Sequence, residues 1–320
     1  MVENKSTIAE NTDIEALKKV MNRDKVLEPE INKLTIGASC YGPIYPETNE
    51  YISLYYEKDL KDKKVLSVTA SGDHILHAAL AGATNITGFD VNRFTKYYSS
   101  LRVAMVKSYD VIKFLSNHQL FFNSIKSLTK LAKFDDTVYR SCLNNIIHIL
   151  SDISSNLSSE EKLFWNEYIK IATKTYVSRH LFVDIDNESC LVNKLAYLEP
   201  SKYEILKSNL NEVNIKYIDS NVNQLDKIVT GNYDFIYLSN IIERILLKDV
   251  YFSSPSEESV DESIDLLIYL SNILNKGGII SDLSFRYYIS TWDSRRLKKV
   301  YEILESKDDK GQHIYRYIKK

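Results

Sequence analysis

The chain contains little cysteine, glycine and proline for its length. Its 320 residues include three cysteines, nine glycines and five prolines. Cys40, Cys142 and Cys190 lie far apart and form no Cys-x-x-Cys pair, which argues against a disulfide framework and against a zinc site. We therefore expect no metal. No internal repeat and no low-complexity tract is present, so a repeat architecture is not indicated.

A long hydrophobic run and an excess of charge of one sign are also missing. No apolar stretch approaches the roughly 18 residues that a membrane span requires, and the first residues lack the apolar core of a secretory signal. The 41 basic and 43 acidic residues are well mixed, so no nucleic-acid partner is expected. We expect a cytoplasmic protein, with a peripheral membrane contact left open through the basic stretches 295–299 and 316–320.

The most informative stretch, residues 65–90, predicts a strand, a tight turn, a helix and a second strand. Its apolar, β-branched start is typical of a buried parallel strand. Gly72 allows the backbone to approach a ligand without a Cβ in the way, and Asp73 opens a helix with free N–H groups. Asp90 ends the second strand, where an acid can accept hydrogen bonds from a ribose diol. The alternative is that Ser71 and Asp73 only cap a helix and Asp90 only ends a strand.

The rest of the chain alternates predicted strands and helices. A helix is expected over 92–115, strands at 214–219, 233–240, 279–285 and 312–318, and further helices near 259–274 and 293–305. The pair Gly277-Gly278 is interpreted as the C-cap of the first of these further helices. This alternation predicts an α/β fold class with a doubly wound, mostly parallel, Rossmann-like sheet.

Between the second and third strands the pattern is helical, with capping-box sequences at Ser158–Glu161 and Ser201–Glu204. We therefore expect three regions. They are an N-terminal helical or irregular segment over 1–60, an α/β domain over 61–116 and 213–320, and a helical insertion over 117–212.

Polar residues fall where the predicted strands end. They are Asp73, Asp90, Asp219, Ser239 and Asn240. Because ligands of such sheets bind beyond the carboxyl ends of the strands, these residues are expected to share one edge. His74 and His77 are interpreted as helix surface or crevice wall rather than as half of a metal site.

Several segments resemble one protein family. They are residues 65–76, 81–92, 101–107, 195–200 and 233–243. The family is the bacterial group related to S-adenosylmethionine:diacylglycerol 3-amino-3-carboxypropyltransferase, within the class I S-adenosylmethionine-dependent methyltransferase fold. The resemblance implies a methyltransferase-type sheet with a large helical insertion.

The resemblance also implies an S-adenosylmethionine site. The residues that match its glycine loop are Ala70, Ser71, Gly72 and Asp73. Those that match the ribose acid and its successor are Asp90 and Asn92. The residue that matches the acid facing the adenine amino group is Asp219. Those that match the strand end beneath the methionine moiety are Ser239 and Asn240.

The implied activity is transfer of a 3-amino-3-carboxypropyl group from S-adenosylmethionine to a small-molecule or lipid acceptor. The alternatives are methyl transfer and a non-catalytic, cofactor-binding protein, whereas the missing glycines argue against a nicotinamide-dependent oxidoreductase. A general base would help a hydroxyl acceptor. The candidates are Tyr41, Tyr45 and Glu243, with Glu47 and Arg286 also on the acceptor side, and packing is the alternative role for each.

Overall fold

The computed structural model describes residues 12–18, 59–131, 136–174, 195–246, 255–284, 295–307 and 313–320. The candidates Tyr41, Tyr45, Glu47 and Arg286 lie outside these residues. In the described part of the chain, no helix is both long enough and apolar enough to cross a membrane.

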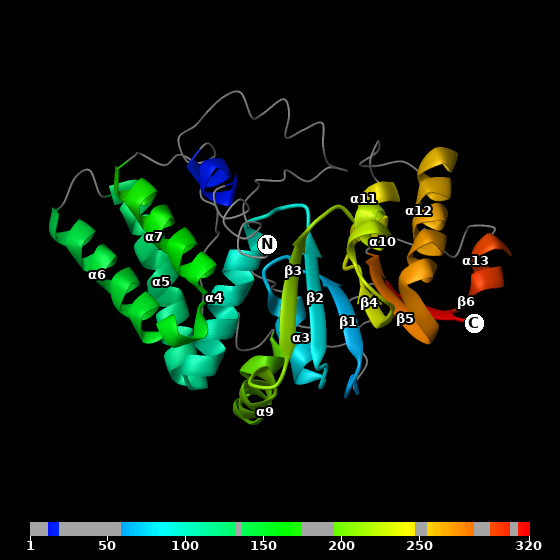
Figure 1. The fold of residues 1–320 in the computed structure, drawn as a ribbon, viewed down its shortest axis with the longest axis horizontal. Helices are drawn as coiled ribbons and strands as arrows, with labels where there is room; N and C mark the ends of the chain where they lie inside the picture. The colour runs from blue at the N-terminus through cyan, green and yellow to red at the C-terminus, as the bar shows by residue number, and fades with distance from the viewer. Residues whose placement is uncertain are drawn as a thin grey trace, which may run out of the picture.

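A seven-stranded sheet runs through the molecule in the order β3-β2-β1-β4-β5-β7-β6 (Figure 1). The first five strands pair in parallel, and β7 is antiparallel to both β5 and β6. The strands are β1 (Lys64–Val68), β2 (Asn85–Asp90), β3 (Asn214–Asp219), β4 (Tyr233–Tyr237), β5 (Leu274–Ser284), β6 (Tyr301–Lys307) and β7 (His313–Lys319). The predicted α/β fold class, with a doubly wound, mostly parallel, Rossmann-like sheet, is confirmed.

Helices cover both faces of the sheet and form two cores. The helices of the first face are α3 (Asp73–Leu80), α4 (Thr95–Ser108) and α9 (Pro200–Leu210). Those of the second face are α10 (Leu225–Ile228), α11 (Ile241–Leu246), α12 (Glu257–Leu270) and α13 (Arg295–Val300). Short 3-10 turns are η2 (Ser154–Asn156), η3 (Ala196–Leu198), η4 (Val222–Gln224) and η5 (Ser271–Ile273).

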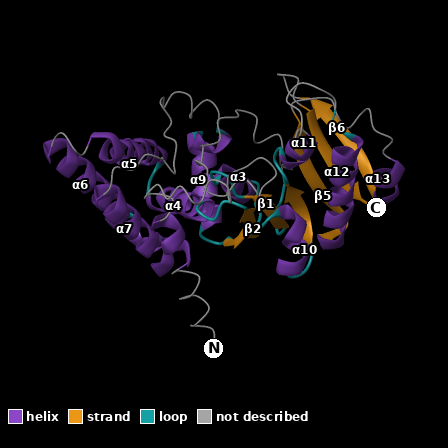
Figure 2. Cartoon of the chain, turned by 90° about the horizontal axis from the view of Figure 1, so that it is seen from above, coloured by secondary structure: helices purple, strands orange, loops and turns teal. Residues whose placement is uncertain are grey.

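Three helices stand beyond α4, at the end of the molecule opposite β6 (Figures 1 and 2). They are α5 (Val111–Leu131), α6 (Asp136–Asp152) and α7 (Ser159–Lys174). Their apolar faces belong to the same core as α3 and α4. The predicted insertion over 117–212 also includes α9, which packs beside α3 on the sheet.

The helix predicted over 92–115 is two helices. α4 ends at Ser108 and Tyr109 takes an extended conformation. The side chain of Asp110 then accepts a hydrogen bond from the backbone N–H of Lys113 at 2.8 Å, which caps α5. The capping box at Ser158 and Glu161 is confirmed by its two reciprocal hydrogen bonds.

The prediction was wrong in two places near the C-terminus. The helix predicted over 293–305 gives way at Tyr301 to β6, because pairing with β7 overrides the helical propensity of this Lys- and Glu-rich segment. The helix predicted to stop at Gly277-Gly278 ends at Leu270 instead. The two glycines lie inside β5, where the pairing with β4 changes register and Gly277 adopts a φ of 73°.

The capping box predicted at Ser201 is also absent. α9 begins at Pro200, its N-cap residue is Glu199, and the Ser201 hydroxyl donates to the Glu199 carboxylate at 2.9 Å. A proline at the first helical position already has no N–H to satisfy.

Candidate functional site

A pocket of about 260 Å³ opens at the carboxyl ends of β1, β2 and β4. Its apolar wall is formed by Val68, Phe89, Val91, Val222, Ile241 and Ile245. Its polar lining is formed by Asp90, Ser220, Asn221, Ser239, Asn240 and Arg244, with Ala70 at the loop after β1. An apolar cleft with a few convergent polar groups is the usual form of a small-molecule site.

Two non-glycine residues of this pocket have left-handed backbone conformations. Ala70, just after β1, has a φ of 44°, and Ser239, just after β4, has a φ of 54°. Such conformations are unfavourable for residues with a Cβ and are concentrated at functional sites. The Ser239 carbonyl is held by the backbone N–H of Leu283 at 2.8 Å. Strain therefore accumulates where the two central strands end.

The carboxylate of Asp90 forms the acidic wall of the pocket. One oxygen accepts the backbone N–H of Ala70 and the other that of Asn92, both at 2.9 Å. Burial raises the pKa of Asp90 to about 6, although these N–H groups oppose the rise. Each carboxylate oxygen has more than one acceptor site, so Asp90 can still receive hydroxyl donors from a ligand.

Gly72 has a packing role that the sequence did not indicate. It adopts a φ of 86°, and a Cβ built on it would lie 2.6 Å from Oγ and 2.7 Å from Cα of Ser99 on α4. The close approach is therefore between the loop and a helix of its own fold. Gly72 therefore meets a packing requirement, and its predicted place in the cofactor loop stays a prediction.

The side chain of Asp73 points into the protein rather than into the pocket. It is fully buried, 2.6 Å from a guanidinium nitrogen of Arg102, and it accepts hydrogen bonds from Ser71 at 2.6 Å and Tyr197 at 2.5 Å. Burial alone would raise its pKa, but the charge of Arg102 lowers the pKa of Asp73 to about 2. Asp73 does open α3, as predicted. Both of its carboxylate oxygens serve internal partners, and its predicted place in the cofactor loop stays a prediction.

Asn92 contributes to the site through its backbone and to the fold through its side chain. Its backbone N–H orients Asp90, and its side-chain oxygen accepts the backbone N–H of Phe94 at 3.1 Å at the start of α4. Only 8% of Asn92 is exposed. Its contribution to the pocket is therefore made through the backbone.

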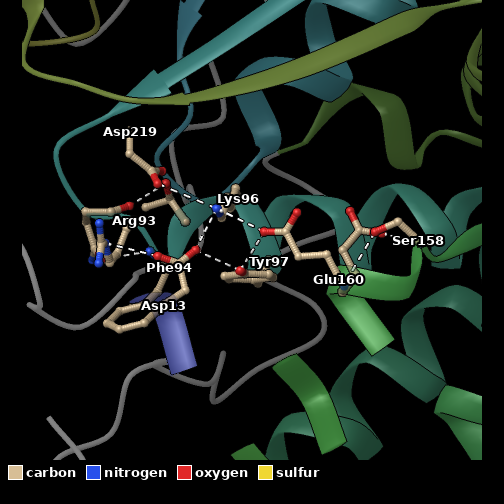
Figure 3. A network of polar contacts seen from close by, with 11 residues as sticks. Asp13, Arg93, Phe94, Lys96, Tyr97, Ser158, Glu160 and Asp219 are labelled. Carbon is tan, nitrogen blue, oxygen red and sulfur yellow. Dashed lines mark hydrogen bonds and ion pairs between the residues drawn. The ribbon is translucent and has the colours of Figure 1, made fainter. Parts of the chain in front are cut away.

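Asp219 lies beside the pocket without lining it. Its carboxylate is 3.5 Å from Lys96, whose ammonium also contacts Asp13 at 2.7 Å and Glu160 at 3.2 Å (Figure 3). Burial raises the pKa of Asp219, and the charge of Lys96 opposes this. Asp13 belongs to the helix over residues 12–18, so this network ties that helix against α4 and α7.

The polar residues that line the pocket after β3 are Ser220 and Asn221. These two residues were not predicted, because the acid that ends the strand, Asp219, was expected to contact the ligand instead. The side-chain oxygen of Asn221 accepts the backbone N–H of Asn223 at 3.2 Å, which caps η4. The sequence Asn221-Val222-Asn223 is typical of a helix cap, and it is the feature that could have indicated this turn.

The predicted residues Ser239 and Asn240 do line the pocket. Arg244, one turn along α11, completes this wall and donates from Nε to the side-chain oxygen of Asn240 at 3.4 Å. Arg244 is exposed. Its place in the pocket wall depends on the position of α11 beside the pocket, which the sequence did not predict.

Glu243 faces the sheet rather than the pocket and is 5% exposed. It lies near Asp282 of β5, which is completely buried. Burial, followed by the negative charge of Glu243, raises the pKa of Asp282 well above its ordinary value. The predicted catalytic role of Glu243 stays a prediction, and the structure adds Asp282 as its acidic neighbour.

The two histidines of α3 are interior residues that do not line the pocket, which corrects their interpretation as helix surface or crevice wall. His74 is 1% and His77 is 3% exposed. Burial lowers the pKa of His74 to about 4 and that of His77 to about 3, so both are neutral at pH 7. No group of three or more metal-ligating side chains was found within the part of the chain that the structure describes.

No protein-family model and no curated protein matches the sequence. Several solved structures are similar to this chain, with TM-scores below 0.5. The rRNA methyltransferase aviRa from Streptomyces viridochromogenes is 8% identical with a TM-score of 0.43, over 88% of this chain and 91% of that chain. An rRNA methylase from Streptococcus thermophilus is 9% identical with a TM-score of 0.31, over 84% and 92%.

The N-methyltransferase NodS from Bradyrhizobium japonicum, in complex with S-adenosyl-L-homocysteine, is 11% identical with a TM-score of 0.23, over 38% of this chain and 63% of that chain.

Proposed function

We propose that this chain binds S-adenosylmethionine in the pocket at the ends of β1, β2 and β4 and transfers the methyl group to an acceptor. The observation that carries the proposal is the carboxylate of Asp90. It lies in the pocket wall, and backbone N–H groups of Ala70 and Asn92 orient both of its oxygens. A carboxylate at the end of the second strand of a doubly wound sheet suits the two hydroxyls of a ribose.

The other pocket residues fit an adenosyl group. The apolar wall of Phe89, Val91 and Val222 offers a surface for an aromatic base. The side-chain oxygen of Asn221 is engaged in capping η4, which leaves its amide N–H groups as donors for a ring nitrogen. The ligand's remaining polar part would meet the strained turn at Ser239 and Asn240. These features support a nucleoside ligand more than a purely apolar one.

When bound, the cofactor supplies a carbon activated by its sulfonium. The pocket contributes alignment, which can lower a barrier by several kcal/mol. Of the three carbons on sulfur, the methyl carbon is the least hindered, and methyl transfer is therefore the reaction proposed. Transfer of the 3-amino-3-carboxypropyl group, implied by the family resemblance, requires the acceptor to face a different carbon. As acceptor we keep the small-molecule or lipid class predicted from the sequence.

Isothermal calorimetry with S-adenosylmethionine, S-adenosylhomocysteine and 5′-methylthioadenosine tests the cofactor. We expect binding of the first two, and weaker binding in Asp90→Asn. Asp234→Asn is the matched control, because Asp234 also accepts a backbone N–H, from Lys64 at 2.9 Å, but at the opposite edge of the sheet. This control should bind as the unmodified protein does.

A second step separates the two reactions. The protein is incubated with S-adenosylmethionine and a panel of amines, hydroxyl compounds and diacylglycerol vesicles, and the by-product is identified by mass spectrometry. S-Adenosylhomocysteine supports methyl transfer, and 5′-methylthioadenosine supports aminocarboxypropyl transfer instead. Absence of binding by all three nucleosides would overturn the proposed cofactor.

A further inference from the structure

We propose that Tyr197 is a positioning residue for the cofactor loop, residues 70–73, and that it acts through Arg102 and Asp73. Tyr197 lies in η3, more than a hundred residues after the loop in the sequence. The inference rests on the proposed function, because it assigns to a residue outside the pocket a share of the affinity for S-adenosylmethionine. Tyr197 is not among the residues that line the pocket.

Three fully buried side chains from separate elements meet beneath the loop. The Tyr197 hydroxyl donates to one carboxylate oxygen of Asp73 at 2.5 Å and accepts a hydrogen bond from the Arg102 guanidinium. Arg102, on α4, also donates to the other carboxylate oxygen of Asp73 at 2.6 Å and to the backbone carbonyl of Ser71 at 3.2 Å. All three side chains are inaccessible to solvent. Hydrogen bonds to charged groups in such surroundings are the strong ones.

The contacts continue from this cluster to the pocket. Ser71, whose carbonyl Arg102 holds, is preceded by Ala70 with its left-handed backbone. The backbone N–H of Ala70 donates to Asp90, the residue proposed to bind the ribose. The path from the Tyr197 hydroxyl to the Asp90 carboxylate is therefore made of hydrogen bonds and one short backbone segment. A loop with a strained residue needs such support to keep its conformation.

The hydroxyl of Tyr197 is the informative atom. A phenylalanine would fill the same space, so Tyr197→Phe removes one donor and one acceptor and leaves the packing in place. Without the hydroxyl, one oxygen of Asp73 loses a donor and the Arg102 guanidinium loses an acceptor. Both groups are buried, so neither can be satisfied by bulk water, and the pair must shift to compensate. The loop that they hold should then become less ordered.

The test compares Tyr197→Phe with Tyr203→Phe. Tyr203 is also completely buried, lies on α9 close in the sequence, and donates its hydroxyl to the backbone carbonyl of Tyr109 at 3.4 Å. Hydrogen–deuterium exchange is measured in the ligand-free proteins, and the dissociation constant of S-adenosylmethionine by calorimetry well below the unfolding temperature. For Tyr197→Phe we expect faster exchange in peptides that cover residues 69–73 and an affinity about tenfold weaker. Tyr203→Phe should change neither.

The outcomes separate the two proposals. If the unmodified protein fails to bind S-adenosylmethionine, the proposed function is wrong, and the exchange of residues 69–73 still decides whether Tyr197 orders the loop. If the unmodified protein binds but Tyr197→Phe binds equally and exchanges equally in the loop, the inference is overturned. If Tyr197 only stabilises the fold, Tyr197→Phe should behave like Tyr203→Phe. Its unfolding temperature would then fall without a selective effect on the exchange of the loop or on the affinity.

Discussion

The carboxylates on the two sides of the loop after β1 have opposite electrostatic environments. On the inner side, Asp73 is neutralised by the buried cation of Arg102, and its pKa falls to about 2. On the outer side, the donors to Asp90 within the described part of the chain are backbone N–H groups, and burial raises its pKa to about 6. One acid is saturated by side chains of the fold, whereas the other keeps acceptor capacity facing a pocket.

This difference indicates which acid is structural and which is available to a ligand. A buried carboxylate paired with a cation stabilises the elements that it joins, and removal of its partner is strongly unfavourable. A carboxylate held by N–H groups alone, with a raised pKa and a cleft in front of it, is typical of a functional site. Substitutions on each side of the loop should therefore have different effects, on stability at the inner side and on binding at the outer side.

The largest effect is expected on the inner side. Arg102→Met leaves Asp73 charged and buried without its cation, and we expect the free energy of unfolding to fall by about 3–5 kcal/mol. The measurement is denaturant unfolding. Arg296→Met is the matched control, because Arg296 contacts two carboxylates, Asp261 and Asp265, at an exposed position, and its loss should cost about 1 kcal/mol or less. Equal effects of the two variants would contradict the structural role of the inner pair.

The two acids should also give opposite dependences of stability on pH. The folded-state pKa of Asp73 lies below its unfolded value, so its contribution is present above about pH 4 and is lost as the pH falls towards about 2. The folded-state pKa of Asp90 lies above its unfolded value, so the folded state holds an extra proton between about pH 4 and 6 and loses stability as the pH rises through that range. Unfolding curves at a series of pH values check both.

Asp90→Asn should abolish the second of these pH effects and leave the first. If the free energy of unfolding of this variant still declines between about pH 4 and 6 as in the unmodified protein, the decline has another source. The same comparison at pH 2–4 serves as the internal control, since Asp73 is unchanged in the variant.

On the outer side the expected effect is on binding. Asp90→Asn should weaken S-adenosylmethionine binding at least tenfold, or about 1.4 kcal/mol, because the amide offers one acceptor oxygen where the carboxylate offers two. Calorimetry at pH 7, where Asp90 is mostly ionised, measures the change. An unaltered dissociation constant would remove Asp90 from the proposed site.

The smallest effect concerns backbone strain at the pocket. Ser239→Gly relieves the left-handed conformation of a residue with a Cβ but increases the entropy of the unfolded chain, so we expect a gain in unfolding free energy of about 0.5 kcal/mol. Binding of S-adenosylmethionine should weaken at the same time, since a glycine holds the turn less rigidly. Thermal unfolding and calorimetry on the same sample measure both. A loss of stability would show that the serine side chain supports the turn.

Much of the fold followed from local sequence patterns. The alternation of β-branched runs with amphipathic segments predicted β1 to β5 and β7, because buried parallel strands are apolar throughout and the helices that cover them have one apolar face. β6 was missed because residues 301–307 have the composition of a helix, and their partner strand is needed to make them a strand. The division between α4 and α5 was missed because it depends on one side-chain cap at Asp110.

The candidate site was predicted less completely. Asp90, Ser239 and Asn240 follow strands and line the pocket, as the position of a strand end within a parallel sheet suggests. Asp73 and Asp219 follow the same rule in the sequence, but they contact Arg102 and Lys96, which lie on α4. The direction of a side chain at a strand end depends on which charged groups the packed helices bring near it.

The sequence by itself determined the class of the sheet, the edge at which polar residues collect, and the acid at the end of the second strand. These depend on periodicity and on chain order, which are local properties. Only the tertiary structure decided that Gly72 serves the packing of α4, that Arg102 neutralises Asp73 while Tyr197 donates a hydrogen bond to it, and that Asn221 rather than Asp219 lines the pocket. Each of these depends on atoms from segments distant in the sequence, and the charge, burial and steric contacts that result exist only once those segments are folded together.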